Sequence, residues 1–157
     1  MDIKRITSFE VDHTCLCEGM YISRVDGDIT TFDLRTRRPN AGDYMDNVTM
    51  HTFEHMFATY IRNSAVGDRV IYFGPMGCQT GFYLLTRDLS PTQAREQVIT
   101  VLQQIIAHEG DVFGASEVEC GNYRSLSLES AKAEAKRYLA VLIRNGETDL
   151  TYEGRQA

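Results

Sequence analysis

The sequence predicts an α+β fold, a largely antiparallel sheet flanked by helices, in a single domain over residues 1–157. Three observations support this prediction. A chain of 157 residues has the length of one domain. Its 43% hydrophobic and 24% charged residues suffice to bury a core. The predicted strands are joined by connections too short for crossover helices, which favours antiparallel pairing.

The first predicted elements are a hairpin and a helix. Residues 20–24 and 28–35 are strand-like and flank the turn signal Asp26-Gly27, which is typical of a hairpin. Over residues 47–64 the apolar side chains recur at helical spacing, which predicts an amphipathic helix. This apolar stripe consists of Met50, Phe53, Phe57, Tyr60 and Ile61.

The second half of the chain predicts further strands and two more helices. In order these are strands over 69–73 and 82–86, a helix that starts after Ser90 and stops by Gly110, a short strand over 116–119, and a helix over 128–144 that Gly146 ends. Ser90, Pro91 and Gln93 have the spacing of a capping box with proline at the first helical position. The pair Gly74-Pro75 is expected to end the strand before it.

Charge and hydropathy exclude several classes of partner. Sixteen basic and twenty-two acidic residues give a net charge of −6, which disfavours binding to nucleic acid or to an anionic membrane. No apolar run approaches the roughly 18–20 residues of a membrane span. The N-terminal residues lack the apolar segment of a secretory signal, so we expect a cytoplasmic protein whose four cysteines are thiols.

A metal site is predicted on the helix over 47–64, where His51, Glu54 and His55 form an H-x-x-E-H sequence. At about 100° per residue, His55 lies about 40° from His51 and Glu54 about 60° to the other side. Two histidines one turn apart can chelate one divalent ion, and an adjacent carboxylate can move protons. A catalytic site needs a third protein ligand, for which Cys120 is the candidate; alone, it would be read as a small buried side chain.

Two further residues are candidates for the chemistry. Cys78 lies among three glycines and a proline in residues 74–81, which indicates a loop that approaches something closely. Its thiol could act as acid, base or nucleophile near a metal, or be a structural cysteine in a tight turn. Arg62 returns to the helix face of His51 and could hold a substrate carboxylate, or be a solvated surface side chain.

Cys15, Cys17 and His108 are read as ordinary side chains. The Cys-x-Cys spacing could suggest a second metal site, but no partner residues stand nearby in the sequence.

Five ordered blocks of the sequence resemble the S-ribosylhomocysteine lyase family, the bacterial autoinducer-2 synthases, over nearly the whole chain. The blocks are Ser8-Phe9 with Asp12-His13-Thr14, Phe32-Asp33-Leu34-Arg35 with Pro39-Asn40, His51-Thr52-Phe53-Glu54-His55, Gly74-Pro75-Met76-Gly77-Cys78-Gln79-Thr80-Gly81, and Glu119-Cys120-Gly121. The sequence departs from the family at Tyr72, where members often carry an acidic residue, and at Cys15-Leu16-Cys17.

The resemblance implies a homodimer with two active sites at the subunit interface. In it, His51, His55 and Cys120 would ligate one ferrous ion per subunit, replaceable by zinc or cobalt. Glu54 and Cys78 would be the general acid/base pair. Ser8, His13 and Arg35 would line the substrate pocket from the neighbouring subunit.

The implied reaction cleaves the thioether of S-ribosylhomocysteine into homocysteine and 4,5-dihydroxypentane-2,3-dione, the autoinducer-2 precursor used in quorum sensing. A Lewis-acidic metal would let the sugar carbonyl migrate to C3, after which β-elimination expels homocysteine. Each migration removes one proton and returns one, which asks for two acid/base groups.

Two other readings compete with this one. A metallopeptidase of the inverzincin kind shares the H-x-x-E-H sequence but needs a downstream carboxylate ligand and a larger chain. A non-enzymatic metal-binding protein would close the site with four protein ligands.

Overall fold

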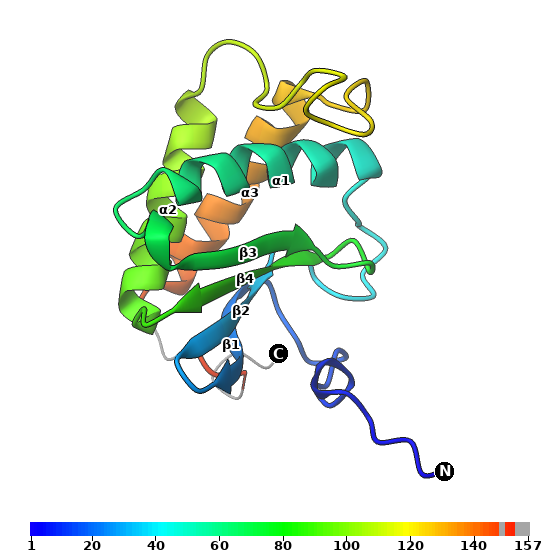
Figure 1. Cartoon of the computed structure of the whole chain (residues 1–157). Helices are drawn as coiled ribbons and strands as arrows, with labels where there is room; N and C mark the ends of the chain where they lie inside the picture. The colour runs from blue at the N-terminus through cyan, green and yellow to red at the C-terminus, as the bar shows by residue number, and fades with distance from the viewer. Residues whose placement is uncertain (148–149, 153–157) are drawn as a thin grey trace.

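A four-stranded antiparallel sheet and three helices make up the computed structural model, which describes residues 1–147 and 150–152 (Figure 1). The strands are β1 (Gly19–Asp26), β2 (Ile29–Arg35), β3 (Val70–Pro75) and β4 (Gly81–Arg87), in the spatial order β1-β2-β4-β3. The helices are α1 (Asn47–Arg62), α2 (Pro91–Ala107) and α3 (Leu128–Asn145), with 3-10 turns at Thr7–Phe9 and Gly67–Arg69. The predicted α+β class is confirmed.

The predicted hairpin is confirmed in β1 and β2. Asp26 pairs with Ile29 across a turn in which Gly27 has a φ of +62°, a conformation that glycine adopts without steric cost. All three pairs of neighbouring strands are antiparallel.

Helix α2 begins directly after Ser90, where the predicted capping box places its start. Ser90 Oγ accepts from the Gln93 backbone N–H, and Gln93 Oε1 accepts from the Ser90 N–H, both at 3.2 Å. Helix α1 is capped by Asp46, whose carboxylate accepts from the Thr49 N–H at 2.7 Å. Gly146 ends α3 with a φ of +66°.

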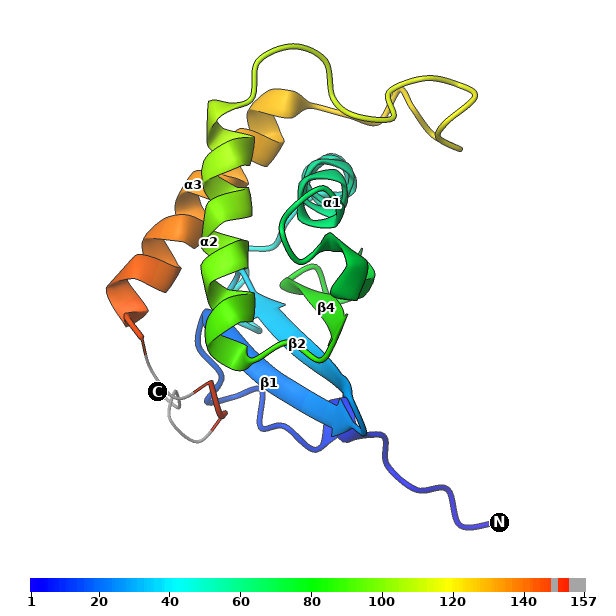
Figure 2. The ribbon, with the colours of Figure 1, turned by 60° about the vertical axis from the view of Figure 1, so that its left-hand side comes forward.

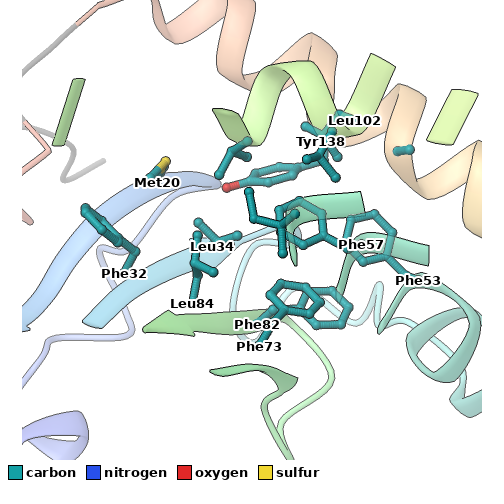
Figure 3. Close-up of a cluster of buried hydrophobic side chains, with 14 of the residues drawn as sticks. Met20, Phe32, Leu34, Phe53, Phe57, Phe73, Phe82, Leu84, Leu102 and Tyr138 are labelled. Atoms are coloured by element: carbon teal, nitrogen blue, oxygen red, sulfur yellow. The ribbon is translucent and has the colours of Figure 1, made fainter. Parts of the chain in front are cut away.

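The core packs one face of α1 onto the sheet (Figure 3). Phe57 stacks on Phe73 of β3 with ring centroids 4.3 Å apart, and Phe53 stacks on Phe82 of β4 at 4.8 Å. Burying four aromatic rings fixes the rotation of α1 about its axis. Its opposite face, which carries the two histidines, therefore turns away from the sheet.

The segment between α2 and α3 covers that opposite face. Figure 2 shows α1 nearly end-on, with residues 108–127 arching over it on the side away from the sheet, and Figure 1 shows the same arrangement from the side. None of the helices in the described part of the chain is both long and apolar enough to cross a membrane.

Three local predictions were wrong. Residues 116–119 form a turn and not a strand, because the carbonyl of Ser116 accepts from the backbone N–H groups of Glu119 and Cys120. Strand β3 continues through Gly74 and Pro75; β3 is an edge strand, where a proline without an N–H is tolerated. Helix α1 ends at Arg62, two residues earlier than predicted.

Candidate active site

Helix α1 and the covering loop together bring into one group three side chains that could hold a metal ion, the candidate metal-binding group. His51 and His55 lie on consecutive turns of α1, and Cys120 comes from the loop between α2 and α3. Their ligand atoms all lie within 4.8 Å of one another, and Cys120 Sγ is 3.3 Å from His51 Nε2. The structure thus brings together the three residues that the sequence analysis selected as metal ligands.

Backbone carbonyls select the tautomer of both imidazole rings. His51 Nδ1 lies 2.9 Å from the Ser125 carbonyl oxygen, and His55 Nδ1 lies 2.7 Å from the Phe113 carbonyl oxygen. Because a carbonyl oxygen only accepts, each Nδ1 carries the hydrogen, and in the neutral ring each Nε2 presents a lone pair. This is how histidine ligands are normally held in metal sites.

The cysteine side of the group is also prepared for a ligand role. The Asn122 backbone N–H donates to Cys120 Sγ at 3.4 Å, which supports negative charge on the sulfur. Gly114 brings the loop against the His55 ring, where a Cβ would lie 3.1 Å from Nδ1. Two imidazoles and a thiolate suit zinc or ferrous iron. Among the described residues no fourth histidine, cysteine or carboxylate joins the group, so the donor set fits an ion with an open position.

Glu54 adjoins the metal-binding group without belonging to it. It precedes His55 in α1 and is half-buried, and its carboxylate has no hydrogen-bond or ion-pair partner within residues 1–147 and 150–152. An unengaged carboxylate beside the candidate ligands is available to take up or release a proton.

Cys78 lies in the turn between β3 and β4, and its side chain is exposed. The turn is held in place by Gln79, whose backbone carbonyl accepts from the Met45 N–H at 3.1 Å and whose side chain donates to the Met45 carbonyl at 2.9 Å. Gln79 itself has a φ of +64°, which is uncommon for a residue with a side chain. The rigid turn presents the thiol at a defined point of the surface.

A buried polar network supports that thiol. Arg35 Nη1 donates to Thr80 Oγ1 at 2.8 Å and lies 3.8 Å from Cys78 Sγ. Since Thr80 Oγ1 accepts from Arg35, its own hydrogen is free to point at Cys78 Sγ, 3.0 Å away. Hydrogen-bond donors and a positive charge therefore converge on the sulfur.

Arg35 is held by Asp33 on the sheet face opposite the helices. The pair is bidentate, at 3.1 and 2.7 Å, with side chains only 3% and 1% exposed. Burial lowers the pKa of Arg35, but the charge and hydrogen bonds of Asp33 outweigh burial and raise it. Tyr152 donates to Asp33 Oδ2 at 2.9 Å; burial and the Asp33 charge raise the pKa of this tyrosine, so it stays protonated.

The thiol opens into a cavity of about 360 Å³ that brings several predicted substrate residues together. Its lining includes Ser8, His13, Arg35, Cys78 and Tyr83. A neighbouring cavity of about 330 Å³ shares His13 and Cys78 with it. His13 Nδ1 lies 2.8 Å from a backbone carbonyl, so its Nδ1 carries a hydrogen.

Arg62 is not part of either group. Its guanidinium donates to the backbone carbonyls of Val70 and Ile71 in β3, at 3.3 and 3.0 Å. Eleven residues separate it from His51, which is about 16 Å along a helix. The structure gives this arginine a role in fixing β3; its proposed contact with substrate stays a prediction.

The metal-binding group and the thiol cavity lie on opposite sides of α1 in one chain. The histidines contact the loop above the helix, whereas Cys78 lies in the turn that joins β3 and β4 of the sheet below it (Figure 1). Neither of the two cavities that Cys78 lines above includes His51 or His55 in its lining. The two groups are therefore separate in one chain.

Sequence reasoning missed Asp33, Thr80 and Tyr152, and with them the network behind Cys78. A signal existed for Asp33, because Asp33 and Arg35 are opposite charges two residues apart on one face of a predicted strand. Tyr152 lies far from the motifs in the sequence, and no local pattern indicates its contact with Asp33.

Together these features define an α+β protein with a candidate His₂Cys metal site, a carboxylate without a partner among the described residues, and a thiol that receives hydrogen bonds. This combination of groups is typical of a metal-dependent acid–base enzyme. Comparison with known proteins gives the family. Residues 6–149 match the family model described as S-Ribosylhomocysteinase (LuxS). The chain belongs to this family, and the prediction of a carbon–sulfur lyase is confirmed.

Several known proteins are similar in sequence to this chain over nearly their full length. The chain is 42% identical to an S-ribosylhomocysteine lyase of Desulfotalea psychrophila, over 96% of this chain and 99% of the relative. It is 41% identical to that of Clostridium beijerinckii and 40% identical to that of Borreliella burgdorferi, with the same shares covered.

Proposed function

We propose that this chain cleaves S-ribosylhomocysteine into homocysteine and 4,5-dihydroxypentane-2,3-dione. The observation that supports the proposal most strongly is that His51, His55 and Cys120 converge with both Nδ1 hydrogens donated to carbonyls. Membership of the S-Ribosylhomocysteinase family supplies the substrate.

In this proposal His51, His55 and Cys120 hold one ferrous ion per subunit, for which zinc or cobalt can substitute. When bound, the ion supplies Lewis acidity that makes protons beside the sugar's carbonyl and hydroxyl groups more acidic. The Ser125 and Phe113 carbonyls keep both histidines in the ligating tautomer, so little reorganisation accompanies binding.

Cys78 and Glu54 carry the protons. The carbonyl moves from C1 to C2 when a proton leaves C2 and one is delivered to C1, and it moves to C3 by the same exchange one carbon further along. Removal of the C4 proton then breaks the C5–S bond and expels homocysteine as its thiolate, which is reprotonated. The enol left at C4 and C5 takes up a proton at C5 and becomes the dione.

Two acid/base groups suit this sequence, because protons leave and return at successive carbons. Thr80 and Arg35 donors at Cys78 Sγ favour its action as a base. Glu54 has no competing partner among the described residues and is available to return the proton. Ser8, His13, Arg35 and Arg62 are proposed to contact the substrate.

A second copy of the chain is proposed to complete each site, as a homodimer. One chain cannot bring its thiol cavity to its own metal-binding group, since α1 lies between them. Exposed apolar side chains lie beside both half-sites: Phe9, at the thiol cavity, is 63% exposed, and Val118, two residues from Cys120, is 97% exposed. Apolar side chains in such positions are typical of an interface.

Release of homocysteine thiol tests the proposal. Metal-loaded protein is incubated with S-ribosylhomocysteine and the new thiol is titrated, then the assay is repeated with Cys78→Ser and Glu54→Gln. We expect turnover by the wild type and a loss of at least a hundredfold in each variant, with metal content unchanged. Cys15→Ser is the matched thiol control and should keep full turnover. A fully active Cys78→Ser enzyme, or peptide hydrolysis without thioether cleavage, would contradict the proposal.

A further inference from the structure

The loop that starts directly after α2 contains His108, the histidine to which the sequence analysis gave no role. This loop, residues 108–114, has neither helix nor strand structure. Its Phe113 carbonyl oxygen is nevertheless the acceptor that holds His55 Nδ1 at 2.7 Å. Something other than regular secondary structure must therefore fix this carbonyl.

Both nitrogens of the His108 ring are engaged. Nε2 lies 2.8 Å from the Asp111 carbonyl oxygen, which only accepts, so Nε2 carries a hydrogen and closes the loop on itself. In the neutral ring Nδ1 then accepts, and the Tyr60 hydroxyl donates to it at 2.7 Å. Lys132 of α3 donates to the His108 carbonyl, also at 2.7 Å. The loop is thereby attached to α1 through Tyr60 and to α3 through Lys132.

Contacts among three aromatic rings connect the attached loop to the Phe113 carbonyl, which accepts from His55. The Phe113 ring contacts Tyr60 edge to face, with centroids 5.2 Å apart, and His108 at 4.9 Å. Tyr60 and His108 are themselves 5.9 Å apart, so the three rings close a triangle. Edge-to-face contacts of this kind favour one mutual orientation. The Phe113 backbone is fixed as a result, and the following residue, Gly114, packs on the His55 ring.

We propose that Tyr60 and His108 are positioning residues for the metal centre: through Phe113 they hold the carbonyl that selects the Nδ1–H tautomer of His55 and aims its Nε2 at the ion. The inference rests on the proposed metal site. Neither residue forms a hydrogen bond with a candidate ligand side chain. Both act instead on the Phe113 carbonyl, which accepts from the ligand His55. Tyr60 and His55 belong to the same helix, so α1 supplies both the ligand and the anchor of its support.

Removing the hydroxyl or the imidazole tests the inference. Tyr60→Phe keeps the ring triangle and loses only the hydrogen bond to His108, and His108→Leu loses both bonds. His108→Gln keeps a donor for the Asp111 carbonyl and should recover part of the loss. Loss of a direct partner of a metal ligand costs about 10–100-fold in affinity, so for these indirect changes we expect a loss near tenfold, measured by chelator competition with Zn²⁺.

A second readout needs no metal. In ¹⁵N-labelled, metal-free protein the imidazole nitrogen shifts report the tautomer of each histidine. We expect His55 to be the Nδ1–H tautomer in the wild type and a tautomer mixture in His108→Leu, while His51 is unchanged. Tyr138→Phe is the control, because it also removes a tyrosine hydrogen bond to a backbone carbonyl, that of Gly19, far from the loop.

Each outcome decides the matter. Wild-type affinity and a single His55 tautomer in Tyr60→Phe and His108→Leu overturn the inference and leave the proposed function standing. An equal loss in Tyr138→Phe also overturns it, since general destabilisation then explains the effect. If the wild type binds no metal, the metal site of the proposed function is wrong, and the tautomer measurement still decides whether this loop orients His55.

Discussion

Substitution of Gly114 by alanine is expected to weaken metal binding, because the added methyl group would press on the ring of the proposed ligand His55. Gly114 has a φ of +69°, and a Cβ added there would lie 3.1 Å from His55 Nδ1 and 3.4 Å from its Cε1. Nδ1 is the atom that donates to the Phe113 carbonyl at 2.7 Å. The new methyl group therefore competes for the space that keeps this ring in the ligating orientation.

Two costs can be separated. The left-handed backbone conformation costs an alanine roughly 1–2 kcal/mol of folding stability. The 3.1 Å contact is shorter than ordinary van der Waals distance, so the ring must give by a few tenths of an ångström. Disturbing the support of a metal ligand costs about 10–100-fold in affinity, which is about 1.4–2.8 kcal/mol of binding free energy.

The control is Gly27→Ala. Gly27 has a φ of +62° in the β1–β2 turn and no atom within 4 Å of an added Cβ. Both variants should unfold at lower urea concentration, but only Gly114→Ala should show a Zn²⁺ dissociation constant raised at least tenfold in chelator competition. Wild-type affinity in Gly114→Ala, or an equal loss in Gly27→Ala, would refute the reasoning.

Three further predictions concern stability. Asp33→Asn leaves Arg35 buried without its countercharge and should cost about 3 kcal/mol or more in urea unfolding; a change below about 1 kcal/mol would show that the pair is not buried as described. Phe53→Ala removes a ring that is 1% exposed and should cost about 3–5 kcal/mol, checked by the same measurement. The third concerns pH: hydrogen bonds from the Thr49 side chain and backbone lower the pKa of Asp46 below 3.8. The stability that Asp46 contributes is therefore complete above that value and is lost as pH falls through the lowered pKa. Asp46→Asn should therefore weaken the dependence of the urea unfolding midpoint on pH as the pH falls below 3.8, and an unchanged pH dependence would contradict this.

Local signals predicted most of the fold because the forces that shape these elements act within a few residues. The Ser90–Gln93 capping box and the turn at Gly27 needed no tertiary information. The turn at residues 116–119 was missed because its hydrogen bonds run to the carbonyl of Ser116, and backbone acceptors leave no trace in the residue types. The path of β3 through Pro75 depends on that strand lying at the sheet edge, which sequence spacing does not reveal.

In the candidate site, too, local spacing was predictable and backbone or tertiary contacts were not. The helical spacing of His51 and His55 predicted a shared face, and the structure confirms it. The carbonyls of Phe113 and Ser125, which orient both rings, were beyond prediction because any residue could supply them. Tertiary contacts likewise gave His108 its position between Tyr60 and Asp111.

Mixing two inactive variants tests the central claim, a lyase site built from the thiol of one subunit and the metal-binding helix of another. Cys78→Ser and Glu54→Gln subunits are denatured together, refolded with metal, and assayed for thiol release from S-ribosylhomocysteine. Random pairing makes half of the dimers mixed, and each mixed dimer has one intact site of two, so about one quarter of wild-type activity should return. Mixed dimers that form, as native mass spectrometry can establish, but release no more thiol than either variant alone would contradict the claim.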